Sequence, residues 1–354
     1  FLHSFRCQAM KYRLTILCAA LALSAGALQA KTFKWTSASD IPTWDIHSQN
    51  NALANGVHAA VYESLVYYNS KTFKPEPVLA TAWKQVTPTQ LRLNLRTGVK
   101  FHDGSTFSAD DAVFSIERAM SKTSNFGIYA QGIDRVVKVD ANTIDIFTKD
   151  PNPVLLNQLT ELRMMSKAWA EKNNSTSPKD IKTQDETFAH RNANGTGPFM
   201  LKEWQPDQKI VLVKNAAWWG KSEGNVTEIV YTPVKAVATR MAALLSGEVD
   251  LVLDPSPQDL PRVRSDASLK VIDGIENRTI FFGMDQFRDE LPGSNIKGKN
   301  PLKDRRVRQA LYQGIDMSTI TRVSLRERET LWFCRRDAPV TTGTQTTVNG
   351  ATIS

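Results

Sequence analysis

The chain has 354 residues, a formal net charge of +8, 41% hydrophobic residues and 23% charged residues. This composition is typical of a folded globular protein and excludes a disordered chain, and the length allows two domains or one large two-lobed domain. Lysine and arginine are spread along the chain and form no basic stripe interleaved with aromatic residues, so nothing indicates nucleic-acid binding.

Residues 10–30 have the features of a secretory leader, and we expect residues 1–9 to be upstream sequence, untranslated or vector-encoded. Met10 is the expected translation start, and it is followed by basic residues, a short apolar run over 14–23 and a small residue, Ala30, at the expected cleavage point. The apolar run is short for a bilayer span. A buried N-terminal helix is the alternative, but the order of charge, apolar run and cleavage site favours a cleaved signal peptide.

The cysteines indicate a protein without disulfides. Cys7 and Cys18 fall before or inside the leader, which leaves Cys334 alone in the mature chain. No intrachain disulfide and no cysteine-based metal site is therefore expected.

Residues 91–120 contain three structural signals in succession. Leucine alternates with polar residues over 91–95, which predicts a strand with one apolar face. His102-Asp103-Gly104 is turn chemistry, and Ser108, three residues before Asp111, resembles a capping box that starts a helix. The apolar face of that helix consists of Val113, Ile116 and Met120.

The other elements suggest alternating helices and strands. In the first half of the chain we expect a strand over 33–37, a helix over 53–66, a hairpin over 136–147 and a helix over 154–170. After these we expect a polar loop with one short helix over 173–190, a strand over 210–213, a helix over 236–245 ended by Gly247, a strand over 249–253 and a helix over 304–316. Helix followed by strand in this order favours an α/β architecture.

Several segments, taken in chain order, match sequence motifs of one protein family. They are Pro-x-Leu-Ala-x-x-Trp within 75–83, Gly-Val-Lys-Phe-His-Asp-Gly over 98–104 with Phe-x-Ala-x-Asp over 107–111, Gly-Thr-Gly-Pro-Phe over 195–199, Asn-x-x-Trp-Trp-Gly over 215–220, the strand-like run 280–283 and the helix over 304–316. In these motifs the chain resembles solute-binding protein family 5, the periplasmic proteins that serve peptide, opine and nickel ABC importers.

The resemblance implies a fold and a domain plan. It implies an α/β, two-lobed periplasmic binding protein, class II-like with an extra small subdomain, whose far lobe is incomplete. The implied plan is upstream residues plus a signal peptide over 1–30, a near lobe over 31–65 and 191–278, a small inserted subdomain over 66–190, the start of the far lobe over 279–322 and a tail outside the family pattern over 323–354.

The resemblance also implies a function. The protein would be a monomer in the periplasm that captures a peptide or peptide-like solute for the transmembrane subunits of an ABC permease, without a cofactor and without catalysis. A nickel- or opine-binding member of the family and an exported hydrolase are the alternatives. A hydrolase would need a nucleophile, a base and an orienting acid, and the sequence offers no such trio.

The family pattern stops after Arg322. A shift of the reading frame near residues 323–330 would restore a sequence similar to that of the family. Read one base later, the codons of Trp332-Phe333-Cys334 encode Gly at the first position, Phe or Ser at the second, and Val or Ala at the third. We therefore expect a frameshifted, C-terminally truncated chain whose binding is impaired. A genuine divergent tail is the alternative.

Two segments are candidates for contact with the solute. Ser37, Ser39, Asp40 and Trp44 follow the first strand, and loops at strand ends line the cleft of hinged α/β binders. The alternative is a turn at Asp40 with Trp44 packed beneath it. Phe282 and Met284 lie at the implied crossing between lobes, where core packing is an equal alternative to ligand contact.

The histidines suggest neither catalysis nor metal binding. His102 and Asp103 are adjacent on a tight turn, so their side chains point apart and pair with no nucleophile. His47, His58, His102 and His190 lack ligand-like spacing. We expect a non-enzymatic protein without a metal site.

Overall fold

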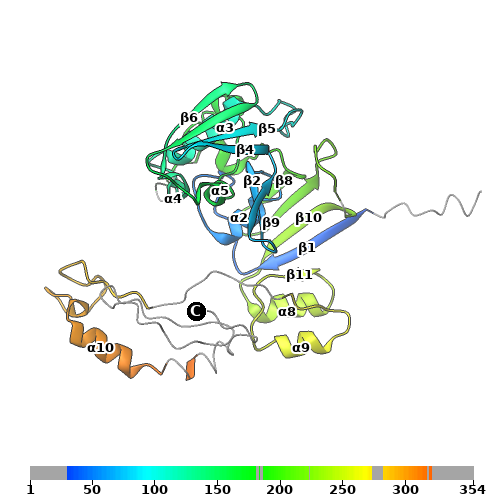
Figure 1. Cartoon of the computed structure of the whole chain (residues 1–354). Helices are drawn as coiled ribbons and strands as arrows, with labels where there is room; N and C mark the ends of the chain where they lie inside the picture. The colour runs from blue at the N-terminus through cyan, green and yellow to red at the C-terminus, as the bar shows by residue number, and fades with distance from the viewer. Residues whose placement is uncertain are drawn as a thin grey trace, which may run out of the picture. The chain divides into compact units, whose positions relative to one another are not determined.

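The computed structural model describes residues 30–180, 183, 186–222, 224–272, 282–316 and 319–320. The chain divides into two compact units, here called unit 1 (residues 1–255) and unit 2 (residues 256–354), and each is described by itself (Figure 1). The expected leader, the expected tail after Arg322 and the start of the run 280–283 lie outside the described residues.

A mixed five-stranded sheet forms one part of unit 1 (Figure 1). Its strands, in spatial order, are β11 (Leu251–Val252), β1 (Lys31–Ser37), β10 (Val226–Pro233), β9 (Lys209–Lys214) and β8 (Phe199–Gln205). β1 runs parallel to both β10 and β11, whereas β10, β9 and β8 are antiparallel. The first strand of the chain is thus completed by strands from much later in the sequence.

An antiparallel four-stranded sheet forms the other part of unit 1. Its order is β4 (Ala80–Thr87), β5 (Gln90–Leu95), β7 (Thr143–Thr148) and β6 (Ile133–Asp140), and helix α3 (Ala109–Met120) packs against β6 and β7. A separate pair consists of β2 (Val66–Asn69) and β3 (Lys74–Pro77). The leucines of β5 are buried, as the alternation predicts, while Arg92 on the opposite face holds Asp145 through two hydrogen bonds of 2.8 and 2.7 Å.

The start of α3 confirms the expected capping box. The Asp111 carboxylate accepts hydrogen bonds from the Ser108 backbone N–H at 2.9 Å and from the Ser108 hydroxyl at 3.1 Å. On the apolar face of the helix, Ile116 is fully buried and Val113 and Met120 pack against the same core. The expected hairpin is also confirmed as β6 and β7.

Two expected helices are shorter than the sequence pattern predicts. The helix over 53–66 is wrong in its extent, since α2 (Ala52–His58) ends at His58. The carbonyls of Ala60 and Val61 instead accept hydrogen bonds from Phe199 N at 3.0 Å and Gly197 N at 2.9 Å. Pairing with a distant segment therefore ends the helix.

The helix over 154–170 is likewise wrong, because it is divided into α5 (Leu155–Leu159) and α6 (Lys167–Lys172). Between them Arg163 forms an antiparallel bridge with Ser64, and Met164 N donates to Glu63 O at 2.8 Å. These backbone hydrogen bonds replace helical ones, so tertiary pairing overrides the apolar periodicity.

The remaining helices are α4 (Gly127–Ala130), α7 (Phe188–Arg191) and α8 (Val237–Leu245) in unit 1, and α9 (Leu260–Ser265), the 3-10 helix η2 (Pro301–Lys303) and α10 (Arg305–Gly314) in unit 2. Gly247 follows α8 with φ +75°, which confirms the expected C-terminal glycine. Asp304 caps α10 by accepting from Arg306 N at 2.8 Å. No residue of α10 is buried.

A buried ion pair joins α3 to the loop that follows β1. Arg118 donates to the two carboxylate oxygens of Asp45, both at 2.7 Å, and its Nε donates to Ser175 O at 3.2 Å. Both side chains are at most 1% exposed. Burial by itself raises the pKa of Asp45, but the charge and hydrogen bonds of Arg118 outweigh burial and lower this pKa below its ordinary value.

The turn at residues 102–104 is bound to the segment 194–197. His102 Nδ1 accepts from Gly195 N at 3.3 Å and His102 Nε2 donates to Gly197 O at 3.0 Å, while Asp103 exchanges hydrogen bonds of 3.0 and 2.9 Å with the Asn194 side chain. Burial lowers the pKa of His102, which suits the neutral ring that these bonds require. Hydrogen bonds thus join two of the family motifs, the turn at 102–104 and the segment 194–197.

Acid should destabilise the fold through two buried histidines. Burial, with the charge of Arg118, lowers the pKa of His47 to about 3, and burial lowers the pKa of His58 to about 4, from 6.5. Between the ordinary pKa of 6.5 and these lowered values, the unfolded chain binds more protons than the folded chain. The free energy of unfolding therefore falls as the pH falls, by up to about 2.7 kcal/mol per pH unit for the two histidines together. Urea denaturation at a series of pH values from about 6.5 to about 4 measures this slope.

The variant His58→Gln keeps a donor for the Thr43 carbonyl, which His58 Nε2 contacts at 2.9 Å, but it cannot titrate. For this variant, the change of the free energy of unfolding with pH should be smaller than for the unsubstituted chain, by about 1.4 kcal/mol per pH unit. An unchanged slope would contradict the assignment.

The variant Gly195→Ala should lose at least about 3 kcal/mol of stability or fail to fold. An added Cβ would lie 2.0 Å from the backbone oxygen of Val61, which cannot move without breaking its hydrogen bond to Gly197. Gly56→Ala is the matched control, because a Cβ there meets nothing within 4 Å and alanine favours the helix. Circular dichroism and chemical denaturation compare the two, and similar stabilities would refute the close approach.

Candidate functional site

The carboxyl ends of three parallel strands meet at one edge of the five-stranded sheet. β1 ends at Ser37, where it pairs with Pro233 of β10, and β11 ends at Val252 beside Thr36. Val234 N donates to Ser37 O at 2.8 Å and Leu253 N donates to Thr36 O at 3.0 Å, so the outgoing loops stay hydrogen-bonded to β1. In open α/β sheets this edge is where ligands bind.

Tyr231 organises the residues at the end of β1. Its hydroxyl lies 2.9 Å from the Ser37 hydroxyl and donates a hydrogen bond to the Ser39 carbonyl. Burial raises the pKa of Tyr231, so the phenol remains a neutral donor. Ser37 is 5% exposed, and the partner of its hydroxyl is Tyr231, which leaves that hydroxyl with capacity for a further hydrogen bond. Ser37 and Ser39 are brought together by a residue that the sequence reasoning did not select.

Asp40 clamps the loop after β1 onto the hairpin of β8 and β9. One carboxylate oxygen accepts from Ile41 N at 2.8 Å, and the other accepts from Trp204 Nε1 at 2.9 Å and Asp207 N at 2.8 Å. Three donors occupy this carboxylate, and it is thus engaged in holding the loop.

Trp44 lies in the core. Its side chain has 0% exposure and its ring lies 5.4 Å from that of His58, centroid to centroid. The placement of Asp40 and Trp44 is that of the turn-and-packing alternative, since neither presents a free polar group at the surface.

Phe282 and Met284 belong to unit 2. Phe282 is 55% exposed and Met284 is half-buried. Because each unit is described by itself, these two residues share no described geometry with the loop after β1, and their contact with a solute stays a prediction.

Arg240 is a second residue of this edge that the sequence reasoning missed. It is 3% exposed, and Nη1 donates to Val234 O at 2.7 Å and to Lys235 O at 3.0 Å. It thereby fixes the connection from β10 to α8. The signal available in the sequence was its position as the one charged residue of a largely apolar helix.

The histidines take structural positions. His102 is bound in the turn described above, and His47 and His58 are buried in the first unit. Across the described ranges, no group of three His, Cys, Asp or Glu side chains could hold a metal ion. None of the described helices is both long enough and apolar enough to cross a membrane.

A family model described as bacterial extracellular solute-binding proteins, family 5 Middle, matches residues 74–331. The chain is 26% identical over 288 residues to a dipeptide-binding protein of Escherichia coli strain K12, covering 73% of this chain and 49% of the relative. It is 28% identical over 291 residues to heme-binding protein A of Haemophilus influenzae, covering 75% and 51%. The chain therefore spans about half the length of these curated relatives.

The fold is similar to that of the oligopeptide-binding protein AppA from Bacillus subtilis, solved in complex with a nonapeptide. The TM-score is 0.72 at 21% identity, covering 84% of this chain and 56% of the solved chain. At this identity the likeness concerns the fold alone.

The variant Tyr231→Phe tests the organisation of this edge. Removing the hydroxyl leaves the Ser37 hydroxyl and the Ser39 carbonyl without their partner, so the free energy of unfolding should fall by about 1–2 kcal/mol. Tyr129→Phe is the matched control, because the Tyr129 hydroxyl makes no hydrogen bond to any described residue, and a change within about 0.5 kcal/mol is expected. Equal effects in urea denaturation would show that the Tyr231 hydroxyl does not support the loop.

Proposed function

The chain belongs to the bacterial extracellular solute-binding proteins of family 5, and we propose that it is the solute-binding component of an ABC importer for peptides or peptide-like solutes. The motif resemblance and the expectation of an α/β periplasmic-binding-protein fold are confirmed. The observation that carries the proposal is the family match over residues 74–331, and the similarity to a dipeptide-binding protein supports the peptide class. Periplasmic location, a permease partner and a monomeric state are parts of the same proposal.

Binding at this site would be non-covalent. The carboxyl edge of the five-stranded sheet would form one wall of a cleft, and a second lobe would close over the solute and exclude water. A peptide is recognised mainly through hydrogen bonds to its backbone, and such bonds are strongest when the protein groups are already held in place. Tyr231 and Asp40 supply this rigidity at the end of β1. We retain Ser37 and Ser39 as the proposed contacts there.

The domain plan expected from the sequence is retained as a proposal. The near lobe would contain the five-stranded sheet, drawn from β1 and from β8 to β11, and the inserted subdomain would contain the four-stranded sheet. The far lobe would begin in unit 2. The packing of α3 against its own sheet supports a subdomain with a separate core.

Peptide binding is the direct test. Isothermal titration with a pool of di- and oligopeptides is run on the 354-residue chain and on any longer form that the DNA beyond codon 322 encodes in the neighbouring frame. We expect micromolar or tighter one-to-one binding by the longer form and at least tenfold weaker binding by the 354-residue chain. Ser37→Ala should weaken binding severalfold, and the exposed Ser70→Ala is its control.

Three results would count against this assignment. Binding of no peptide by either form would overturn the peptide class, and saturable binding of heme alone would replace it with the class named by the second relative. Release of cleaved peptide would overturn a purely binding function. Equal affinity of the two forms would overturn the expected truncation.

A further inference from the structure

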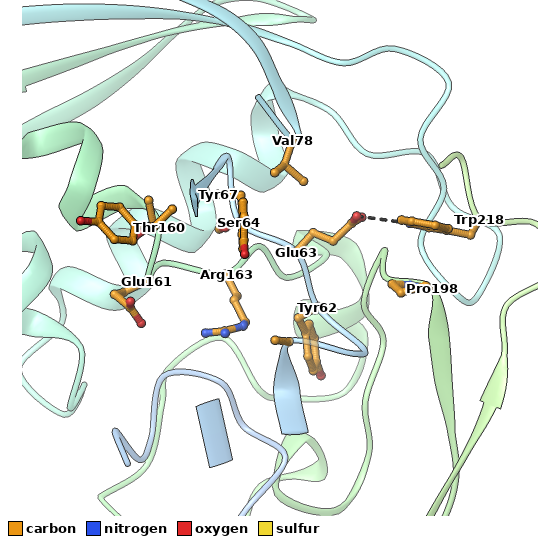
Figure 2. A pocket seen from close by; sticks show the side chains of 12 residues that line it. Tyr62, Glu63, Ser64, Tyr67, Val78, Thr160, Glu161, Arg163, Pro198 and Trp218 are labelled. Carbon is orange, nitrogen blue, oxygen red and sulfur yellow. Dashed lines mark hydrogen bonds between the residues drawn. The ribbon is translucent and has the colours of Figure 1, made fainter. Parts of the chain in front are cut away.

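A pocket in unit 1 lies apart from the residues assigned to the sheet edge. It has a volume of about 490 Å³ and opens between the chain after α2, strand β2 and the segment that joins α5 to α6 (Figure 2). Sites for small molecules have volumes of roughly 300–1,000 Å³. None of the residues Ser37, Ser39, Asp40 and Trp44 lines this pocket.

Two side chains of opposite charge, Arg163 and Glu161, line the pocket without forming an ion pair with each other. Arg163 donates one hydrogen bond, from Nη2 to Asn55 O at 2.9 Å, and within the described part of the chain neither Arg163 nor Glu161 has a charged partner in contact. Burial lowers the pKa of Arg163, and electrostatic interactions with Glu161 and Tyr129 oppose that effect. Figure 2 draws no hydrogen bond between these two side chains.

Arg163 is half-buried, and none of its side-chain nitrogen atoms is both buried and without a hydrogen-bond partner, so the donors that do not contact Asn55 remain accessible to an acceptor. An arginine and a carboxylate in the wall of one pocket can bind the carboxylate and the ammonium group of a zwitterion, respectively.

Aromatic rings form the rest of the wall. Tyr67 and Tyr68 are 55% and 36% exposed, and their hydroxyls make no hydrogen bond to described residues. Trp218 is held by Glu63, to which its Nε1 donates at 3.2 Å, as the dashed line in Figure 2 shows. Trp219 Nε1 donates to the same carboxylate at 2.9 Å, so Glu63 is already occupied by protein donors. The aromatic rings of this wall can contact an apolar group of a ligand. Because Glu63 is bonded to the two tryptophans, Glu161 is the lining carboxylate that can bind a cationic group.

We propose that this pocket is a second binding site, for a free α-amino acid with a large apolar or aromatic side chain. Arg163 binds the carboxylate, Glu161 binds the ammonium group, and the side chain packs against Tyr67, Tyr68 and Trp218. The proposal goes beyond the capture of peptides at the sheet edge and does not rest on it, because all of these residues belong to unit 1.

Titration of the full chain with L-phenylalanine tests the site, with N-acetyl-L-phenylalanine and L-phenylalaninamide as probes that lack one charge each. We expect saturable binding of the amino acid and at least tenfold weaker binding of both derivatives. Glu161→Gln should weaken L-phenylalanine binding at least tenfold and leave the residual affinity for the N-acetyl derivative unchanged. Glu171→Gln, on the exposed side of α6, is the matched control and should change nothing.

Ser37→Ala separates this site from the sheet edge. It should leave L-phenylalanine affinity unchanged, just as Glu161→Gln should leave any peptide affinity unchanged, with thermal melts confirming that both variants fold. The proposal is overturned if L-phenylalanine does not bind saturably at millimolar concentration, if both derivatives bind as tightly as the amino acid, or if Ser37→Ala and Glu161→Gln weaken the same ligand equally.

Discussion

The buried ion pair between Asp45 and Arg118 is the interaction on which the rest of unit 1 depends. It connects the loop after β1, which belongs to the five-stranded sheet, with α3, which covers the four-stranded sheet. Both charges are removed from water, so each requires the other, and loss of one partner of such a pair costs about 3–5 kcal/mol. The same pair fixes the course of the loop between Asp40 and His47, and therefore the position of the candidate edge.

The residues that mark the family are mainly structural. The turn at residues 102–104 and the segment 194–197 hydrogen-bond to each other, and Gly195 and Gly197 allow the backbone to approach Val61 closely. A side chain in either position would collide with a carbonyl oxygen. These motifs identify the protein because the packing between its two sheets tolerates few alternatives, and they carry no chemistry of their own.

Both proposed binding sites are built from groups that the fold holds in place. At the sheet edge, Tyr231 and Asp40 fix the end of β1 through hydrogen bonds to neighbouring strands. In the pocket of unit 1, Glu63 fixes Trp218, while Arg163 and Glu161 keep hydrogen-bonding capacity that the protein does not use. The contrast between satisfied and unsatisfied polar groups distinguishes scaffold from candidate contacts.

The sequence by itself determined the elements whose signals are local. The alternation in β5, the capping box of α3, the hairpin of β6 and β7 and the glycine after α8 each depend on neighbours a few residues away, and the structure agrees with all of them. The tertiary structure alone decided where α2 ends, where the expected helix over 154–170 divides, and which donors Asp40 and Asp45 receive. These features depend on hydrogen bonds between residues far apart in the chain, and apolar periodicity contains no information about such partners.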